Sequence, residues 1–138
     1  MDYLSAYRSW CENPALNGEG KTELASIAGD TKEIEYRFGA ELEFGTAGMR
    51  GIIGYGTNMM NVYTVRRATQ GLSEYVKSLG AEAMKRGVVI SYDTRRKSRE
   101  FAFAAAGVLA ANGIVAYVFD DVHPVPMLSY AVRRLKTI

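Results

Sequence analysis

The sequence predicts an α/β fold in which helices pack on a small, mostly parallel sheet. Two β-branched apolar runs, Val88–Ile90 and Ile114–Phe119, alternate with longer segments of helical periodicity. Strands that are apolar on both faces are typical of parallel sheets covered by helices. Parallel neighbours need a helical crossover, so the order strand, helix, strand, helix favours a layered α/β domain.

Length and composition are consistent with one such domain. The 138 residues and the hydrophobic share of 48% are enough for a core. A net charge of +2 is too small to indicate a nucleic-acid partner, which needs a strong basic excess on one face. Cys11 is the single cysteine, which excludes an intramolecular disulfide and a cysteine zinc cluster. With no secretory pattern after Met1, we expect a cytoplasmic protein.

One apolar stretch is long enough to be compared with a membrane-spanning helix. Phe101–Phe119 is apolar apart from Asn112 and exceeds the length of about 18 residues that suggests a span. Asn112 and Gly113 are typical of a helix C-terminus, and β-branched residues follow them. We therefore expect a buried helix followed by a buried strand, and no membrane partner.

The first forty residues are expected to form a peripheral helical segment. Asp2 is a suitable N-cap for a helix over Tyr3–Glu12. Two further short amphipathic helices are predicted over Thr22–Ala28 and Thr31–Phe38. No catalytic grouping of residues occurs in this segment, so residues 41–138 are expected to carry the main domain.

The main domain is predicted to contain three longer helices. Asn61 is a suitable N-cap for the first of them. The helices are expected over Val62–Leu79, Arg99–Asn112 and Met127–Leu135, with a loop over residues 123–126 before the last. Ligands of open α/β sheets bind at the carboxyl ends of the strands, so the polar connections between elements are the places to look for a site.

The glycine-rich run Phe44–Gly51 is the first candidate site. Its glycines let backbone N–H groups approach an anion, while Thr46 offers a hydroxyl and Arg50 a forked cation, which together suit a phosphate. The alternative is a tight structural turn that carries an exposed arginine.

The connection Asp93–Arg99 is the second candidate. It places four cations around Ser98 at a helix start, where a phosphate or a nucleic acid would find opposite charge. These cations are Arg95, Arg96, Lys97 and Arg99. The alternative is that Asp93 or Ser98 caps the helix and the cations form a solvated face.

Two other polar features are weaker candidates. His123, the single histidine, precedes a proline and is more typical of a loop residue than of a general base. Asp120 and Asp121 lack a third ligand and are more typical of strand-end capping than of a metal site.

Four segments, in order, resemble the first domain of the phosphoglucomutase/phosphomannomutase (phosphohexomutase) family. The match spans Leu42 to Leu135 and is more specific than any one motif. The segments are Phe44–Gly51, Tyr63–Gly71, Ser91–Ser98 and Ala110–Ile114.

The resemblance implies a four-domain enzyme that interconverts hexose 1-phosphate and hexose 6-phosphate. A phosphoserine in a central cleft would donate its phosphoryl group to the hexose phosphate, with Mg²⁺ neutralising charge. Arg50 matches the family arginine that faces the phosphoserine, and Thr46 and Ala47 match the neighbouring loop positions. Ala47 offers only its backbone there. Arg95, in the second candidate connection, is expected to be a further phosphate-binding residue.

Family features are also missing from this sequence. No Thr-x-Ser-His-Asn-Pro nucleophile loop and no Asp-x-Asp-x-Asp metal loop occurs in it. We therefore expect an N-terminal fragment, truncated before the catalytic serine loop, that holds no catalytic residue, binds no metal alone and is inactive. Ser129, inside a predicted helix, is no substitute nucleophile.

Two further expectations follow. The alternative function is a non-catalytic phosphate-binding or interaction module that kept the fold. A strand missing after Ile138 would leave a sheet edge open, so we also expect the chain to self-associate through that edge.

Overall fold

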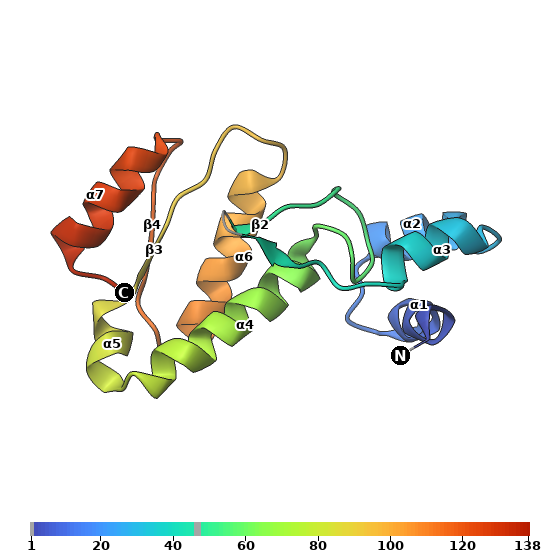
Figure 1. Ribbon diagram of the computed structural model, residues 1–138, viewed down its shortest axis with the longest axis horizontal. Helices are drawn as coiled ribbons and strands as arrows, with labels where there is room; N and C mark the ends of the chain where they lie inside the picture. The colour runs from blue at the N-terminus through green and yellow to red at the C-terminus, as the bar shows by residue number, and fades with distance from the viewer. Residues whose placement is uncertain (1, 46–47) are drawn as a thin grey trace. The chain divides into compact units, whose positions relative to one another are not determined.

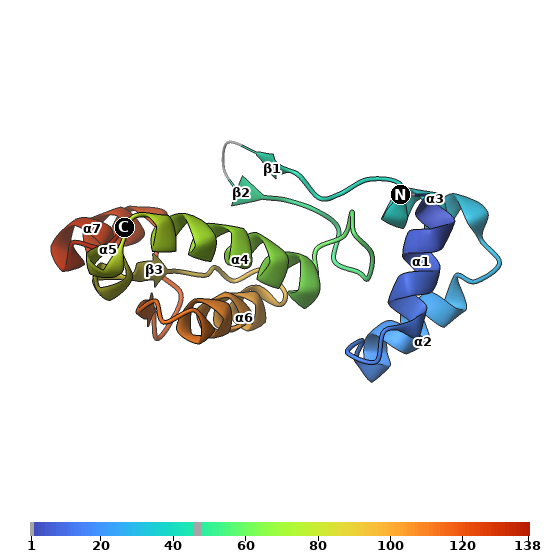
Figure 2. The same cartoon turned by 90° about the horizontal axis from the view of Figure 1, so that it is seen from below.

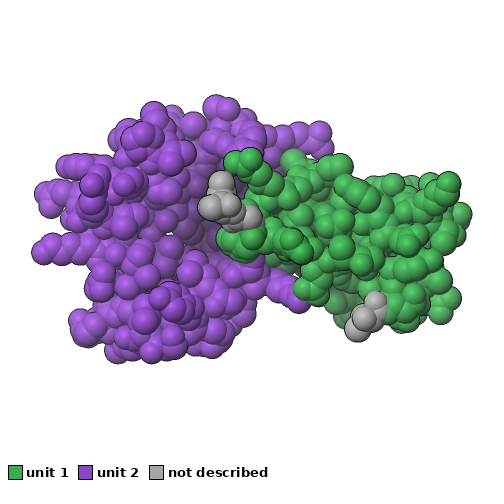
Figure 3. Space-filling model, in the orientation of Figure 1, with its two compact units in different colours: residues 1–64 green, residues 65–138 purple. Residues whose placement is uncertain are grey.

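The computed structural model describes residues 2–45 and 48–138, which form two compact units (Figures 1 and 3). The first unit is Met1–Thr64 and the second is Val65–Ile138. Each unit is described by itself below. The functional division at residue 40 stays a prediction.

The first unit contains three helices followed by a short hairpin. The helices are α1 (Tyr3–Glu12), α2 (Gly18–Ser26) and α3 (Thr31–Phe38). The strands β1 (Phe44–Gly45) and β2 (Gly48–Met49) pair antiparallel. The described segment 50–61 then leads to the start of α4 (Val62–Ser78).

The helices of this unit share a core with the segment that follows the hairpin. Trp10 packs edge-on against Phe38 and Tyr63, at ring-centroid distances of 5.7 and 5.6 Å. The buried residues of the core are Ala6, Leu16, Leu24, Ile34, Phe38 and Tyr55. The helices of residues 2–40 therefore pack on a later part of the chain as well as on one another.

Helix capping explains where the sequence predictions hold and where they are wrong. The bounds of α1 and α3 are confirmed, but Asp2 makes no side-chain capping bond. Helix α2 begins at Gly18, not at Thr22, because the side chain of Asn17 accepts a hydrogen bond from the N–H of Gly20 at 2.8 Å.

The second unit is an α/β layer built on two parallel strands. After α4 come α5 (Ala81–Arg86), β3 (Val88–Ile90), α6 (Ser98–Ala111), β4 (Ala116–Val118) and α7 (Val125–Leu135). Helix α7 contacts β3 and α6 contacts β4, from opposite sides of the strands (Figures 1 and 2). The α/β fold with a small parallel sheet is confirmed.

The register of β3 on β4 places one buried cluster on one face of the strands, while Val89 is buried on the other face. Val88 pairs with Ala116 and Ile90 with Val118, and Val88, Ile90 and Ala116 pack against the buried cluster of this unit. That cluster consists of Val76, Ala83, Leu109 and Ile114. Buried apolar contacts thus join α4, α5, α6 and both strands.

Several predicted bounds in this unit are wrong by a few residues. Helix α7 begins at Val125 because a proline is tolerated in the first turn of a helix, so residues 125–126 are not loop. Strand β4 is shorter than the predicted Ile114–Phe119. The predicted helix end at Asn112 and Gly113 is confirmed, and Gly113 has a φ of +74°. In the described part of the chain, no helix is long and apolar enough to cross a membrane.

Candidate functional site

Arg50 lies at the end of the β1–β2 hairpin in the first unit. Phe44 pairs with Met49 and Gly45 with Gly48, so Arg50 follows the hairpin directly. Its side chain is exposed and makes no hydrogen bond or ion pair with the residues that the structure describes. The other predicted ligands in this loop, Thr46 and Ala47, lie outside the described residues. An unpartnered guanidinium beside a short hairpin is chemically suited to a phosphate.

Both stems of this hairpin are bonded to one later segment of the chain. On the entering side, the N–H of Leu42 donates to the carbonyl of Thr57 at 2.9 Å. On the leaving side, the N–H of Met60 donates to the carbonyl of Ile52 at 2.8 Å. The position of Arg50 therefore depends on how segment 53–61, which we call the support loop, is held.

Asn61 holds the support loop from inside. Its side-chain oxygen accepts from the N–H groups of Tyr63 at 3.1 Å and Thr64 at 2.9 Å, which confirms the predicted N-cap of α4. Its amide nitrogen lies 2.9 to 3.2 Å from three carbonyl oxygens, and the residue is 5% exposed. These carbonyls belong to Gly54, Gly56 and Met59. One buried side chain thus fixes the loop and starts the helix.

Arg95 lies in the connection after β3, in the second unit. Its guanidinium Nε donates to the carboxylate of Asp93 at 2.6 Å, and its backbone N–H donates to the same side chain at 3.0 Å. The hydrogen bond from the Arg95 side chain lowers the pKa of Asp93, although burial opposes this shift. Arg95 is 80% exposed on its side chain, so it is available to an anion only in competition with Asp93.

Neither capping alternative for this connection is correct. The hydroxyl of Ser98 accepts a hydrogen bond from the N–H of Asp93 at 3.1 Å, while Lys97 occupies the N-cap position with a φ of +62°. Farther along, the guanidinium of Arg99 lies 4.9 Å from the ring centre of Phe103. The predicted cluster is therefore divided among separate contacts. Arg50 and Arg95 belong to different units, and each is described within its own unit.

The residues after β4 form local contacts. Nε2 of His123 lies 3.5 Å from a carboxylate oxygen of Asp120, and its ring packs edge-on against Phe119 at 5.2 Å. Among residues 2–45 and 48–138, no group of three or more histidine, cysteine or acidic side chains is placed to hold a metal ion. His123 is a loop residue, as the sequence indicates.

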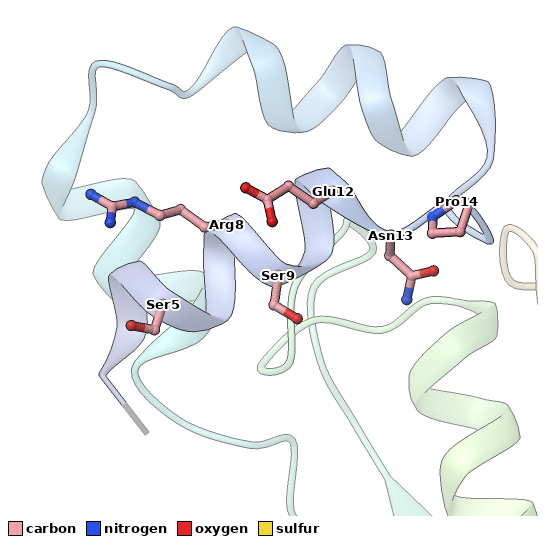
Figure 4. A pocket seen from close by; sticks show the side chains of 6 residues that line it. All are labelled: Ser5, Arg8, Ser9, Glu12, Asn13 and Pro14. Atoms are coloured by element: carbon pink, nitrogen blue, oxygen red, sulfur yellow. The ribbon is translucent and has the colours of Figure 1, made fainter.

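A shallow depression lies along α1 and the turn after it, and no predicted site residue is among the residues that line it (Figure 4). It is lined by Ser5, Arg8, Ser9, Glu12, Asn13 and Pro14. In Figure 4 the Arg8 guanidinium extends away from Glu12, so the polar groups do not converge on one point. We assign no ligand to this depression.

Comparison with family models gives a match over most of the chain. Residues 41–138 match the model described as phosphoglucomutase/phosphomannomutase, alpha/beta/alpha domain I. The observed order of helices and parallel strands in the second unit fits that description. Comparison with solved structures finds no match.

Curated relatives belong to the same group of enzymes. A phosphopentomutase from Mus musculus is 38% identical over 133 residues, which cover 92% of this chain and 21% of that protein. A glucose 1,6-bisphosphate synthase from Homo sapiens is 33% identical over 141 residues, which cover 98% of this chain and 22% of that protein. A phosphoglucomutase from Staphylococcus aureus is 43% identical over 107 residues, which cover 76% of this chain and 19% of that protein.

The chain spans about a fifth of the length of these relatives. The match of residues 41–138 to the first domain agrees with the motifs that carry Arg50 and Arg95. The chain therefore belongs to the phosphoglucomutase/phosphomannomutase family, and its residues 41–138 match alpha/beta/alpha domain I of that family.

Proposed function

We propose that the whole protein is a cytoplasmic phosphohexomutase and that this chain supplies part of its phosphate-binding surface. The names of the relatives share sugar phosphates as substrates or products, and hexose phosphates are the substrate class we propose here. The transferred group would pass through a phosphoserine that this sequence does not contain. The chain's own part is to bind and orient a phosphate.

The unpartnered guanidinium of Arg50 carries this proposal. A cation that makes no ion pair with the described residues retains its full capacity for a bidentate contact to phosphate oxygens. Phosphoryl transfer depends mainly on positioning and on electrostatic stabilisation of the phosphate oxygens, which such a group provides. Thr46, Ala47 and Arg95 are proposed as further phosphate ligands because they lie in the two segments, Phe44–Gly51 and Ser91–Ser98, that resemble loops of the family.

Mg²⁺ is proposed for the full-length enzyme, where it would neutralise charge on the transferred phosphoryl group. The described residues do not gather three suitable side chains, so they do not fit a magnesium site. We therefore assign the metal no ligand in this chain and derive no step through it.

A binding experiment tests the phosphate site. The chain is titrated with inorganic phosphate by isothermal calorimetry, and Arg50→Ala is compared with Arg134→Ala, which removes an exposed arginine from α7. We expect weak binding that Arg50→Ala reduces by about tenfold and Arg134→Ala leaves unchanged. Equal affinity in both variants and in the unmodified chain would refute the role of Arg50.

An activity assay tests the proposed division of labour between this chain and the rest of the protein. Supplied with Mg²⁺, glucose 1-phosphate and glucose 1,6-bisphosphate, the chain should form no glucose 6-phosphate, because no nucleophile loop is present. Ser129 is an exposed residue of α7 and serves as the control position. Turnover that persists through repurification and disappears in Ser129→Ala would show that the chain carries its own nucleophile.

A further inference from the structure

The support loop is attached to the C-terminal end of α3. The N–H of Asn58 donates to the carbonyl of Arg37 at 2.9 Å, and its side-chain amide donates to the carbonyl of Tyr36 at 3.0 Å. The hydroxyl of Thr57 donates to the carbonyl of Ala40 at 2.7 Å. The last carbonyls of a helix have no partner within the helix, so the loop satisfies groups that would otherwise need water.

The side chain of Arg37 reaches the same loop from another direction. It donates to Glu33 at 2.7 Å, pairs with Glu23, and donates to the carbonyl oxygen of Tyr55 at 3.3 Å. Glu23 in turn accepts from the N–H of Tyr55 at 3.0 Å. Both backbone polar groups of Tyr55 are thus held by one ion-paired cluster, which we call the Tyr55 clamp: Glu23, Glu33 and Arg37.

The clamp is largely withdrawn from solvent. The side chain of Arg37 is 13% exposed, whereas those of Glu23 and Glu33 are 31% and 37% exposed. Burial alone would lower the pKa of Arg37, but its hydrogen bonds to Glu33 and Glu23 outweigh burial and raise it. The arginine is charged across the ordinary pH range, so the clamp does not depend on titration of the cation.

The backbone of the support loop lies so close to α3 and to the clamp that two of its positions have no room for a side chain. A Cβ atom added at Gly56 would lie 2.7 Å from the carbonyl oxygen of Arg37. At Gly54 it would lie 2.8 Å from the end of Met59 and 3.3 Å from a guanidinium nitrogen of Arg37. Glycine at both positions allows the loop to lie directly on α3 and on the clamp.

We propose that Arg37 is a positioning residue for Arg50, acting through Tyr55 and the support loop to which both stems of the hairpin are bonded. The helices of residues 1–40 then act as the base on which the phosphate-binding arginine is oriented. This inference rests on the proposed phosphate role of Arg50, but the mechanical link from Arg37 to Arg50 is a separate claim and is measured separately.

Two readouts on the full 138-residue chain test this proposal. The first is the backbone ¹⁵N order parameter of Arg50 together with amide exchange at Tyr55 and Met60. The second is affinity for inorganic phosphate. The test variant is Arg37→Met, and the matched control is Arg86→Gln, since Arg86 also bonds backbone carbonyls, those of Lys136 and Thr137 in the second unit.

In Arg37→Met we expect amide exchange in the support loop to rise by about tenfold, with a lower order parameter at Arg50. Phosphate affinity should fall by about threefold because the cation is no longer preorganised. Arg86→Gln should change neither readout. A folded Arg37→Met chain with unchanged order at Arg50 would overturn the proposal, as would a more mobile Arg50 that binds phosphate equally well.

Glu23 variants keep the test decisive if Arg37→Met fails to fold. Glu23→Gln retains an oxygen that accepts from the N–H of Tyr55, whereas Glu23→Ala does not. We expect Glu23→Gln to keep most of the order at Arg50 and Glu23→Ala to lose it; equal order in the two would contradict the clamp. If the unmodified chain binds no phosphate while Arg37 still orders Arg50, the proposed function fails and the positioning link stands.

Discussion

The backbone N–H of Ile138 donates a hydrogen bond of 2.9 Å to the carbonyl oxygen of Gly87. On the other edge of β3, the N–H of Val88 donates to the carbonyl of Val115 at 2.8 Å, so β4 and Ile138 lie on opposite sides of this strand. On the edge of β3 that Ile138 occupies, the next peptide groups are those of Val89. They have no backbone partner among the residues that the structure describes. In its backbone hydrogen bonding this edge of β3 is open to another strand, although side chains leave Val89 only 8% exposed.

The open edge of β3 leads us to expect self-association. Light scattering over a dilution series should show an average mass that rises with concentration, and exchange of the Val89 amide should slow in parallel because a partner strand covers it. A monomeric mass at every concentration, with a Val89 amide protected throughout, would show instead that the chain closes its own edge.

Glycine substitutions should have opposite effects at two positions. Gly56→Ala should destabilise the chain by roughly 1 to 3 kcal/mol or more, because Gly56 has a φ of +142° and its added methyl group would meet the carbonyl of Arg37. Gly71→Ala, on the exposed surface of α4 with nothing within 4 Å, should stabilise it by about 0.5 to 1 kcal/mol. Urea unfolding measures both; a neutral Gly56→Ala would mean that the loop does not lie against α3.

Asn61→Asp should be destabilising although aspartate is a good N-cap. One carboxylate oxygen would keep the bonds to Tyr63 and Thr64, but the other would face three carbonyl oxygens in place of an amide donor. We expect a loss of about 2 to 4 kcal/mol in the free energy of unfolding. Asn17→Asp is the control, since that side chain caps α2 at an exposed position. A similar small effect at both positions would contradict the central role of Asn61.

The Asp93–Arg95 pair should contribute stability that depends on pH. The pKa of Asp93 is lowered in the folded chain, so its contribution is present above the ordinary pKa of an aspartate and is lost as pH falls through the lowered value. The difference in stability between the unmodified chain and Asp93→Asn should be at most about 1 kcal/mol at neutral pH, because the pair is exposed. This difference in stability should vanish in strong acid. A difference that grows as the pH falls would contradict a lowered pKa of Asp93 in the folded chain.

Release of Arg95 in the same variant should raise phosphate affinity if Arg95 is a ligand. Asp93→Asn removes the negative charge that now pairs with the guanidinium of Arg95 at 2.6 Å. Calorimetric titration with inorganic phosphate should show tighter binding by about twofold to threefold. Unchanged or weaker binding would remove Arg95 from the proposed site.

Local sequence patterns predicted most of the elements that local interactions determine. Helix α3, the N-cap at Asn61 and the left-handed Gly113 each depend on residues within four positions of one another. Helix α5 was missed because its six residues, between Gly80 and Gly87, are too few to show helical periodicity.

The support of the candidate site could not be predicted in the same way. The glycine-rich run singled out Arg50, and the family resemblance then favoured its phosphate role. Glu23, in contrast, contacts Tyr55 across 32 positions of sequence, and no local pattern indicates such a contact. Only the pairing of Glu33 with Arg37, four residues apart on α3, had a sequence signal. The sequence indicated Arg95 as a phosphate-binding residue but did not indicate its ion pair with Asp93.

Mapping of inorganic phosphate on the ¹⁵N-labelled chain tests whether Arg50 binds phosphate. We expect the largest amide shift changes at Gly48, Met49, Arg50 and Gly51, and Arg50→Ala should abolish them. No change at these amides, or larger changes along α1 at Arg8 or on α7 at Arg133 and Arg134, would contradict the assignment of Arg50 as the phosphate-binding residue of this chain.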